Sequence, residues 1–214
     1  MVGKACFLCE SNSQPAHIEA FDPENPNSVI CPLCTSPSIS LDLEHGQRVL
    51  EHISTHVLFD RSVNHTEEPC GLCLHPVAIC HYYLKKGKGA HGSLKIDQEK
   101  TQSCPTKPKL SYSIASMSTK SSPCSNIPII CPLCSKLDPM VWCYNIKYHF
   151  IQAHPNADLK KYTNLWDLEN FEILEMKKKW ADRHRVMAKR GKKSKAAPLV
   201  ISDAHRLQIP LAVG

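Results

Sequence analysis

The chain has 214 residues, of which 16 are Pro, 8 are Gly and 12 are Cys, and its formal net charge is +6. This composition argues against one large apolar core and favours a set of small modules. Residues 1–20 contain no segment of the kind that directs secretion, and no apolar run is long enough to span a membrane. We therefore expect an intracellular, reducing compartment, where Cys-x-x-Cys pairs serve more often as metal ligands than as disulfides.

The N-terminal segment, residues 1–28, carries the first Cys-x-x-Cys pair, Cys6 and Cys9. The next pair belongs to the pentapeptide Ile-Cys-Pro-Leu-Cys at residues 30–34, which recurs at residues 130–134. Together, the first two pairs could form a four-cysteine ribbon around one metal ion. One metal ion cannot use both this set and the histidines that follow, so the two arrangements are alternatives.

Residues 29–60 have the pattern of a first zinc finger. An amphipathic helix from about His45 carries two histidines that are four residues apart and so share one helix face. The spacing C-x2-C-x17-H-x3-H predicts a metal site formed by Cys31, Cys34, His52 and His56. We favour this set over the cysteine ribbon because a shared metal ion explains why both histidines lie on one face of the predicted helix.

Residues 66–127 form a Cys-rich middle module. Its spacing predicts a further metal site held by Cys70, Cys73, Cys104 and Cys124, with Cys80 as the alternative fourth ligand. His81 and His91 are further candidate ligands. The alternation in "LSYSIASMS", residues 110–118, predicts a strand.

Residues 128–157 predict a second finger around the second copy of the pentapeptide. Trp142, Ile146 and Phe150 form an apolar helical stripe, and Pro155 ends the helix. The spacing C-x2-C-x14-H-x4-H predicts a metal site formed by Cys131, Cys134, His149 and His154.

Residues 158–195 predict an amphipathic helix that is capped by Asn164, with Asp167 three residues later. The second half of this segment, residues 177–195, has ten Lys or Arg against the single Asp182, whereas the rest of the chain is net negative. An anionic partner would therefore be met mainly here. The side chains that we expect to contact nucleic acid in this cluster are Lys178, Arg183, Arg185 and Lys189.

Within the basic cluster, "KRGKK" at residues 189–193 is typical of a nuclear-import signal. Residues 196–214 are expected to form a flexible tail.

These motifs together resemble those of C2H2-type zinc-finger proteins. The run from "EEPCGLC" through "SSPCSNIPIICPLC" to "YNIKYHFIQAHP" and "LWDLENFEILEMKKKW" is similar to a multi-copy fungal group, and the resemblance covers residues 29–195. It implies bound Zn²⁺ and, by analogy with the wider class, DNA binding. Carried over by position, the base-reading side chains would be His45, Arg48 and Glu51 in the first finger and Trp142, Asn145 and Tyr148 in the last. Of these, Arg48 suits guanine, and we assign Trp142 to the core.

We therefore expect an α+β fold of small zinc-stabilised modules, in which two Cys/His fingers flank a Cys-rich module. Long linkers would join the modules, and an amphipathic basic helix would follow them. The expected function is DNA binding in the nucleus with a role in transcription regulation, and RNA is a second candidate ligand. The alternative is a protein-interaction module, because fingers so far apart cannot read adjoining base triplets. We expect no enzyme activity, small-molecule substrate or membrane contact, since four protein ligands leave zinc no open position.

Overall fold

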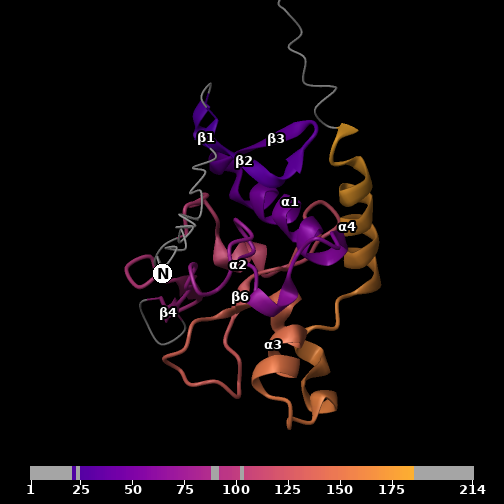
Figure 1. Ribbon diagram of the computed structural model, residues 1–214. Coiled ribbons are helices and arrows are strands. Elements are labelled where there is room, and N and C mark those ends of the chain that lie inside the picture. Colours follow the sequence, from indigo (N-terminus) through magenta and orange to yellow (C-terminus); the bar gives the residue numbers. More distant parts are fainter. Residues whose placement is uncertain (1–20, 23–24, 88–91, 102–103, 186–214) are drawn as a thin grey trace, which may run out of the picture.

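The computed structural model describes residues 21–22, 25–87, 92–101 and 104–185 of the chain. It has an α+β architecture of small antiparallel sheets and short helices (Figure 1). Among these residues, no helix combines the length and the apolar character that crossing a membrane requires.

The first Cys/His segment folds as a three-stranded antiparallel sheet followed by a helix. The sheet has the order β1-β2-β3 and consists of β1 (Phe21–Asp22), β2 (Asn25–Thr35) and β3 (Ser38–Asp42). A short 3-10 helix, η1 (Leu43–His45), then leads directly into α1 (Gly46–Phe59), where the sequence predicts a helix.

Helix α1 is enclosed on more than one face. Its buried apolar residues are Val49, Leu50, Ile53 and Val57, and β3 contributes Ile39 and Leu41 to the same core. In all, nine of the 14 residues of α1 are buried, which is more than a single amphipathic stripe requires. The helix therefore has packing partners on sides other than the one facing its own sheet.

The middle segment contains short elements only. These are η2 (His65–Glu67), the antiparallel hairpin of β4 (Leu84–Lys86) and β5 (Leu94–Ile96), and the helix α2 (Tyr112–Ala115). The strand predicted at residues 110–118 is wrong, because α2 occupies that position. The alternation fails at Ile114, which is 59% exposed, while the neighbouring Ala115 is fully buried.

The last Cys/His segment repeats the order of a hairpin and a helix. Strand β6 (Pro128–Ile129) pairs antiparallel with β7 (Val141–Trp142), and η3 (Cys143–Asn145) leads into α3 (Ile146–Ala153). Helix α3 ends just before His154, in agreement with the stop expected at Pro155.

The C-terminal helix begins later than the sequence indicates. Residues Leu159–Leu165 form the 3-10 helix η4, which contains Asn164, and α4 spans Asn170–Asp182. The prediction that Asn164 caps the long helix is therefore wrong, and Glu169 stands at the N-cap without a side-chain capping bond. Trp166 lies between the two helices and packs against the hydrophobic cluster of the last finger, so the chain turns there.

One hydrophobic cluster joins most of the described chain. Its buried members extend from Cys31 in β2 to Met176 in α4 and include Cys104 and Trp142. A smaller cluster forms around Phe150 in α3. The residues between the two fingers are thus packed parts of a common core and not the long linkers that we expected, since the middle segment supplies many of its buried side chains.

Candidate metal centres

Three groups of four Cys and His side chains come together in the structure. Within each group, the potential ligand atoms all lie within 4.8 Å of one another. The first group is Cys31, Cys34, His52 and His56; the middle group is Cys70, Cys73, Cys80 and Cys104; the last group is Cys131, Cys134, His149 and His154. Each group could hold one metal ion. The structure brings together all the ligands predicted for the two fingers and three of the four predicted for the middle module.

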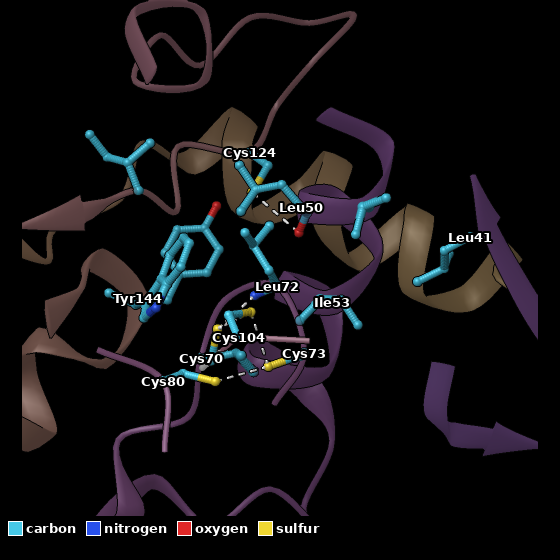
Figure 2. Close-up of a cluster of buried hydrophobic side chains, with 14 of the residues drawn as sticks. Leu41, Leu50, Ile53, Cys70, Leu72, Cys73, Cys80, Cys104, Cys124 and Tyr144 are labelled. Atoms are coloured by element: carbon cyan, nitrogen blue, oxygen red, sulfur yellow. Dashed lines mark hydrogen bonds between the residues drawn. The ribbon is translucent and has the colours of Figure 1, made fainter. Parts of the chain in front are cut away.

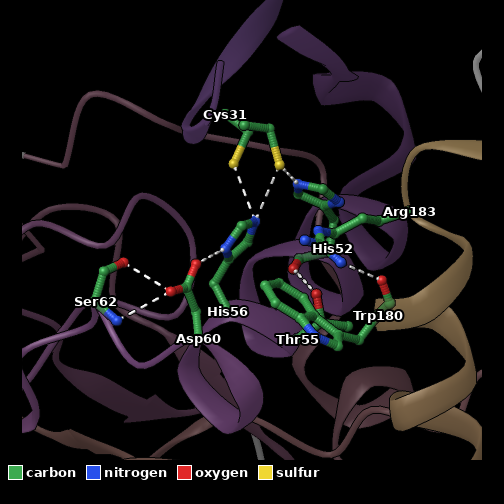
Figure 3. A network of polar contacts seen from close by, with 9 residues as sticks. Cys31, His52, Thr55, His56, Asp60, Ser62, Trp180 and Arg183 are labelled. Carbon is green, nitrogen blue, oxygen red and sulfur yellow. Dashed lines mark hydrogen bonds and ion pairs between the residues drawn. The ribbon is translucent and has the colours of Figure 1, made fainter. Parts of the chain in front are cut away.

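The first group has the spacing that a tetrahedral metal site requires. The Nε2 atom of His56 lies 3.4 Å from Cys31 Sγ and 3.2 Å from Cys34 Sγ, and His52 Nε2 lies 3.6 Å from Cys34 Sγ. In a tetrahedral zinc site, ordinary bond lengths place sulfur and nitrogen ligands about 3.6 Å apart. Figure 3 shows both imidazoles pointing at the sulfur atoms. Strand β2 supplies the sulfurs and α1 the nitrogens.

The protonation of this group also suits a metal. Burial lowers the pKa of His52 to about 3 and lowers the pKa of His56, so both rings are neutral near pH 7. Neutral imidazole is the form that binds metal ions. Burial also raises the pKa of Cys31 to about 12, and a bound cation would reverse this effect by stabilising the thiolate.

A carboxylate orients one of the two histidines. Asp60 Oδ2 lies 2.9 Å from His56 Nδ1, the ring nitrogen that faces away from the sulfurs. The other carboxylate oxygen accepts hydrogen bonds from the backbone N–H and the hydroxyl of Ser62, at 3.0 and 2.7 Å. Although partial burial raises the pKa of Asp60, these hydrogen bonds keep it below its ordinary value. Metal-binding histidines commonly have such a carboxylate partner, which fixes the tautomer and the ring orientation.

Helix α4 covers the first group. The Trp180 ring meets the His56 ring edge to face at a centroid distance of 5.0 Å, and the Arg183 guanidinium lies 3.5 Å from the Trp180 ring centroid. Burial raises the pKa of Cys34, and the nearby Arg183 opposes that rise. Figure 3 shows Trp180 and Arg183 reaching from α4 toward the histidines of α1. The C-terminal helix therefore belongs to the surroundings of this site.

The middle group consists of four buried thiols. Sulfur separations are 3.9 Å for Cys70 and Cys104, 3.6 Å for Cys73 and Cys104, and 3.4 Å for Cys73 and Cys80. Four sulfurs around one zinc ion would be about 3.8 Å apart. The backbone N–H of Leu72 points at Cys70 Sγ from 3.5 Å, as expected of a turn that supports a thiolate. No disulfide joins the described cysteines.

Burial and hydrogen bonds between neighbouring sulfurs shift the pKa values of three thiols of the middle group in different directions. Burial raises the pKa of Cys70, and hydrogen bonds to neighbouring sulfurs, with Cys104 first among them, raise that of Cys73. Hydrogen bonds from Cys70, Cys73 and Cys80 lower the pKa of Cys104. A cation at the centre would stabilise further thiolates.

A close approach of two segments fixes the turn in this group. Gly71 lies against the Trp142 ring, and a Cβ atom at that position would be 2.3 Å from the ring. The turn can therefore pack against β7 only with glycine there. This packing couples the middle group to the start of the last finger.

Cys124 is not part of the middle group, which corrects the predicted fourth ligand. Its buried thiol lies against α1, 4.0 Å from the Leu50 carbonyl oxygen, and Figure 2 shows it apart from the four sulfurs. The residues after it run along α1, where Asn126 donates a hydrogen bond to Ser54 at 2.9 Å. Burial raises the pKa of Cys124 to about 12, so it is a protonated core residue. The short separation between Cys73 and Cys80 was the sequence feature that favoured the correct residue.

The last group repeats the geometry of the first with a different carboxylate. His149 Nε2 and His154 Nε2 both lie 3.2 Å from Cys134 Sγ, and His154 Nε2 lies 3.4 Å from Cys131 Sγ. Glu68, at the end of η2, places Oε1 2.6 Å from His149 Nδ1. Sequence reasoning missed Glu68 because it is 81 residues away from this histidine.

The side chains expected to read bases are mostly engaged within the molecule. Glu51 is buried, forms an ion pair with Lys179 at 2.9 Å and accepts a hydrogen bond from Ser122 at 2.8 Å. Asn145 is fully buried, with its Oδ1 2.9 Å from His65 Nδ1 and its Nδ2 3.2 Å from the His65 carbonyl oxygen. Neither side chain is available to a base edge.

The other residues expected to contact nucleic acid differ in exposure. Arg48 and Lys178 are exposed, and the exposed His45 and Arg185 each contact a neighbouring Asp. Tyr148 is 43% exposed, Trp142 is buried as we assigned it, and Arg183 stacks on Trp180. Lys189, Cys6 and Cys9 lie outside the described residues.

Comparison of the chain with protein-family models, curated proteins and solved structures finds no match in any of the three.

Proposed function

We propose that this chain is a protein folded around three structural zinc ions, and that it acts by binding a protein partner and not as an enzyme or a reader of DNA sequence. Two Cys₂His₂ groups and one Cys₄ group are donor sets that zinc favours in tetrahedral sites. Each group offers four protein ligands, which leaves no position for a substrate or an activated water. The ions would supply folding energy and no chemistry.

The observation that carries this proposal is the burial of Glu51 and Asn145, one polar base-reading position in each finger. A finger reads DNA by laying an exposed helix face in the major groove. In α1, Glu51 is held by Lys179 of α4, and α4 lies along that helix (Figure 1). In the last finger, Asn145 is held by His65. These intramolecular interactions oppose sequence readout by either finger.

The exposed apolar residues favour a protein partner. Tyr148 and Ile151 are exposed on α3, and Ile173 and Leu174 are exposed on α4. Large apolar side chains that face water in this way are typical of surfaces that bind other proteins.

Binding to nucleic-acid backbones is the second candidate function. Lys178 and Arg185 are exposed at the C-terminal half of α4 and just beyond it, and the basic cluster continues past the described residues. Such a cluster would bind phosphates without sequence preference. The "KRGKK" segment further supports a nuclear location, which we propose on sequence grounds alone.

Selection from random DNA by the zinc-loaded full chain separates these functions. We expect no base motif. Any retained DNA should dissociate as salt rises, and Lys178→Ala with Arg185→Ala should lower the salt slope by about 0.9 for each phosphate that is no longer neutralised. A recovered motif that Arg48→Ala relaxes at one base pair would overturn the proposal.

A further inference from the structure

An apolar groove lies where the two fingers and the C-terminal helix meet. It has a volume of about 390 Å³, and its apolar walls include Phe59 of α1, Tyr148 of α3, Trp166 and Leu168 before α4, and Ile173 of α4. This volume falls within the roughly 300–1,000 Å³ that is usual for binding sites. The groove is separate from the three metal groups, since none of their ligands lines it.

Two side chains of opposite charge lie in this apolar surface. Lys147 and Asp167 both line the groove and are exposed. Neither side chain has a hydrogen bond or ion pair to another residue in the described part of the chain. By contrast, Lys179 on the other side of α4 is paired with Glu51. A ligand that covered Lys147 and Asp167 without offering opposite charges would bury two unpaired ions, and this desolvation would oppose binding.

Both fingers are needed to form the groove. Phe59 lies one turn after the metal-group residue His56, and Tyr148 directly precedes His149. Buried Glu172 fixes α4 by accepting hydrogen bonds from the N–H and the hydroxyl of Ser125, at 2.9 and 2.7 Å, and from the Tyr144 hydroxyl. The groove should therefore exist only when the first and last metal groups are formed.

The walls of the groove favour a helical ligand. Its residues come from α1, η3, α3, α4 and the segment between η4 and α4, and no strand of the described structure contributes to it. An extended peptide binds by pairing with an exposed strand edge, whereas an amphipathic helix fits its apolar face into a groove between helices. Because no strand edge lies at this surface among the described residues, the groove suits an amphipathic helix and not an extended peptide.

We propose that this groove binds an amphipathic helix of a partner protein. The helix would place apolar side chains, spaced three or four residues apart, against Tyr148, Trp166 and Ile173. It would carry an acidic residue opposite Lys147 and a basic residue opposite Asp167. This inference rests on the proposed protein-binding function and adds to it the surface and the chemistry of the partner.

The test uses a phage library of helical 14-residue peptides, selected on the zinc-loaded full chain. Peptides with the stated apolar spacing and one charge of each sign should be enriched. Ile173→Asp should weaken binding of an enriched peptide by at least about tenfold, because it places a charge in the apolar wall. The matched control is Ile114→Asp, since Ile114 of α2 is 59% exposed and does not line the groove; it should change binding less than about twofold.

A charge swap makes the test specific. Lys147→Glu should weaken binding about tenfold, and replacing the acidic residue of the peptide by Lys should restore it. Zinc content and circular dichroism of each variant show that it is folded. If the enriched peptides bound the Ile173→Asp and Lys147→Glu variants as tightly as the parent chain, the groove would not be the binding site, although the proposed protein-binding function would stand. A DNA motif recovered without any enriched peptide would overturn both.

Two other occupants would also contradict the proposal. If a chain ending at Lys195 bound the peptides at least about tenfold more tightly than the full chain, residues 196–214 would be the occupant. If the full chain formed dimers that Ile173→Asp dissociated, a second copy would be the occupant. We expect neither: the shortened and full chains should bind equally, and the peptide complex should contain one chain.

Discussion

The first and last Cys/His groups share a donor set and a pentapeptide, but they differ in how they are buried. Cys31, Cys34 and His56 are almost fully buried, and the two cysteines belong to the large hydrophobic cluster that extends to α4. In the last group, Cys134 and His154 are only half-buried, and the cluster around Phe150 has four fully buried members. The same ligand motif is thus enclosed by the large hydrophobic cluster in the first group and is more exposed in the last.

The carboxylate partners differ in the same way. The Asp60 side chain that orients His56 is four residues away, directly after α1. The Glu68 side chain that orients His149 comes from the middle segment. The first Cys/His segment therefore supplies its own supporting carboxylate and is covered by α4, whereas the last Cys/His segment takes its supporting carboxylate from the middle segment. The ligand motif alone does not determine whether a finger is an independent unit.

The largest expected effect comes from removing one histidine of each group. A structural zinc ion contributes about 10–16 kcal/mol of apparent binding energy, which exceeds the net stability of most domains. His56→Ala should expose the amides of α1 and α4 together, because the large cluster depends on that group. His149→Ala should expose α3 and leave α1 protected. Hydrogen exchange measures both, and equal loss of protection in the two variants would contradict the difference.

A smaller effect is expected from the supporting carboxylates. Loss of such a partner commonly lowers metal affinity about 10–100-fold. Asp60→Asn should weaken zinc binding at the first group and Glu68→Gln at the last, as measured by competition with a chelator. Asp158→Asn is the control, because Asp158 caps η4 and is not bonded to a metal-group residue. If Glu68→Gln weakened zinc binding at the first group, the assignment of Glu68 to the last group would be wrong.

The smallest expected effect concerns the cover over the first group. Arg183→Gln removes the guanidinium from the Trp180 ring and from the surroundings of Cys34, which should lower the free energy of unfolding by about 0.5–2 kcal/mol. Arg185→Gln, whose parent residue forms only an exposed pair with Asp182, should cost less than about 0.5 kcal/mol. Denaturant unfolding of the two zinc-loaded variants gives the comparison. Equal losses of unfolding free energy in the two variants would show that the contact of Arg183 with Trp180 does not stabilise the first group.

Sequence reasoning succeeded where the pattern was local. Histidines spaced four or five residues apart after a repeated Cys-Pro-Leu-Cys turn could hardly serve any purpose but a shared ligand, and those two sets do come together. Helix α1 followed from apolar spacing in the same way.

At the candidate sites, the failures occurred where partners are distant in sequence. Cys124 and Cys80 were both acceptable as the fourth ligand of the middle group, and the path of residues 124–126 along α1 is what keeps Cys124 out of it. The burial of Glu51 and Asn145 depends on interactions with Lys179 and His65, which no local pattern predicts. For the same reason, the sequence made Glu51 and Asn145 look accessible to base edges, although both are buried.

The most direct test of the account counts zinc ions by native mass spectrometry in three chains. The parent chain should carry three ions, Cys80→Ser should carry two, and Cys124→Ser should keep all three, because Cys124 is a core thiol outside the metal groups. A parent chain with fewer than three ions would contradict the central claim. Loss of an ion from Cys124→Ser with three retained in Cys80→Ser would likewise contradict the middle group as the structure has it.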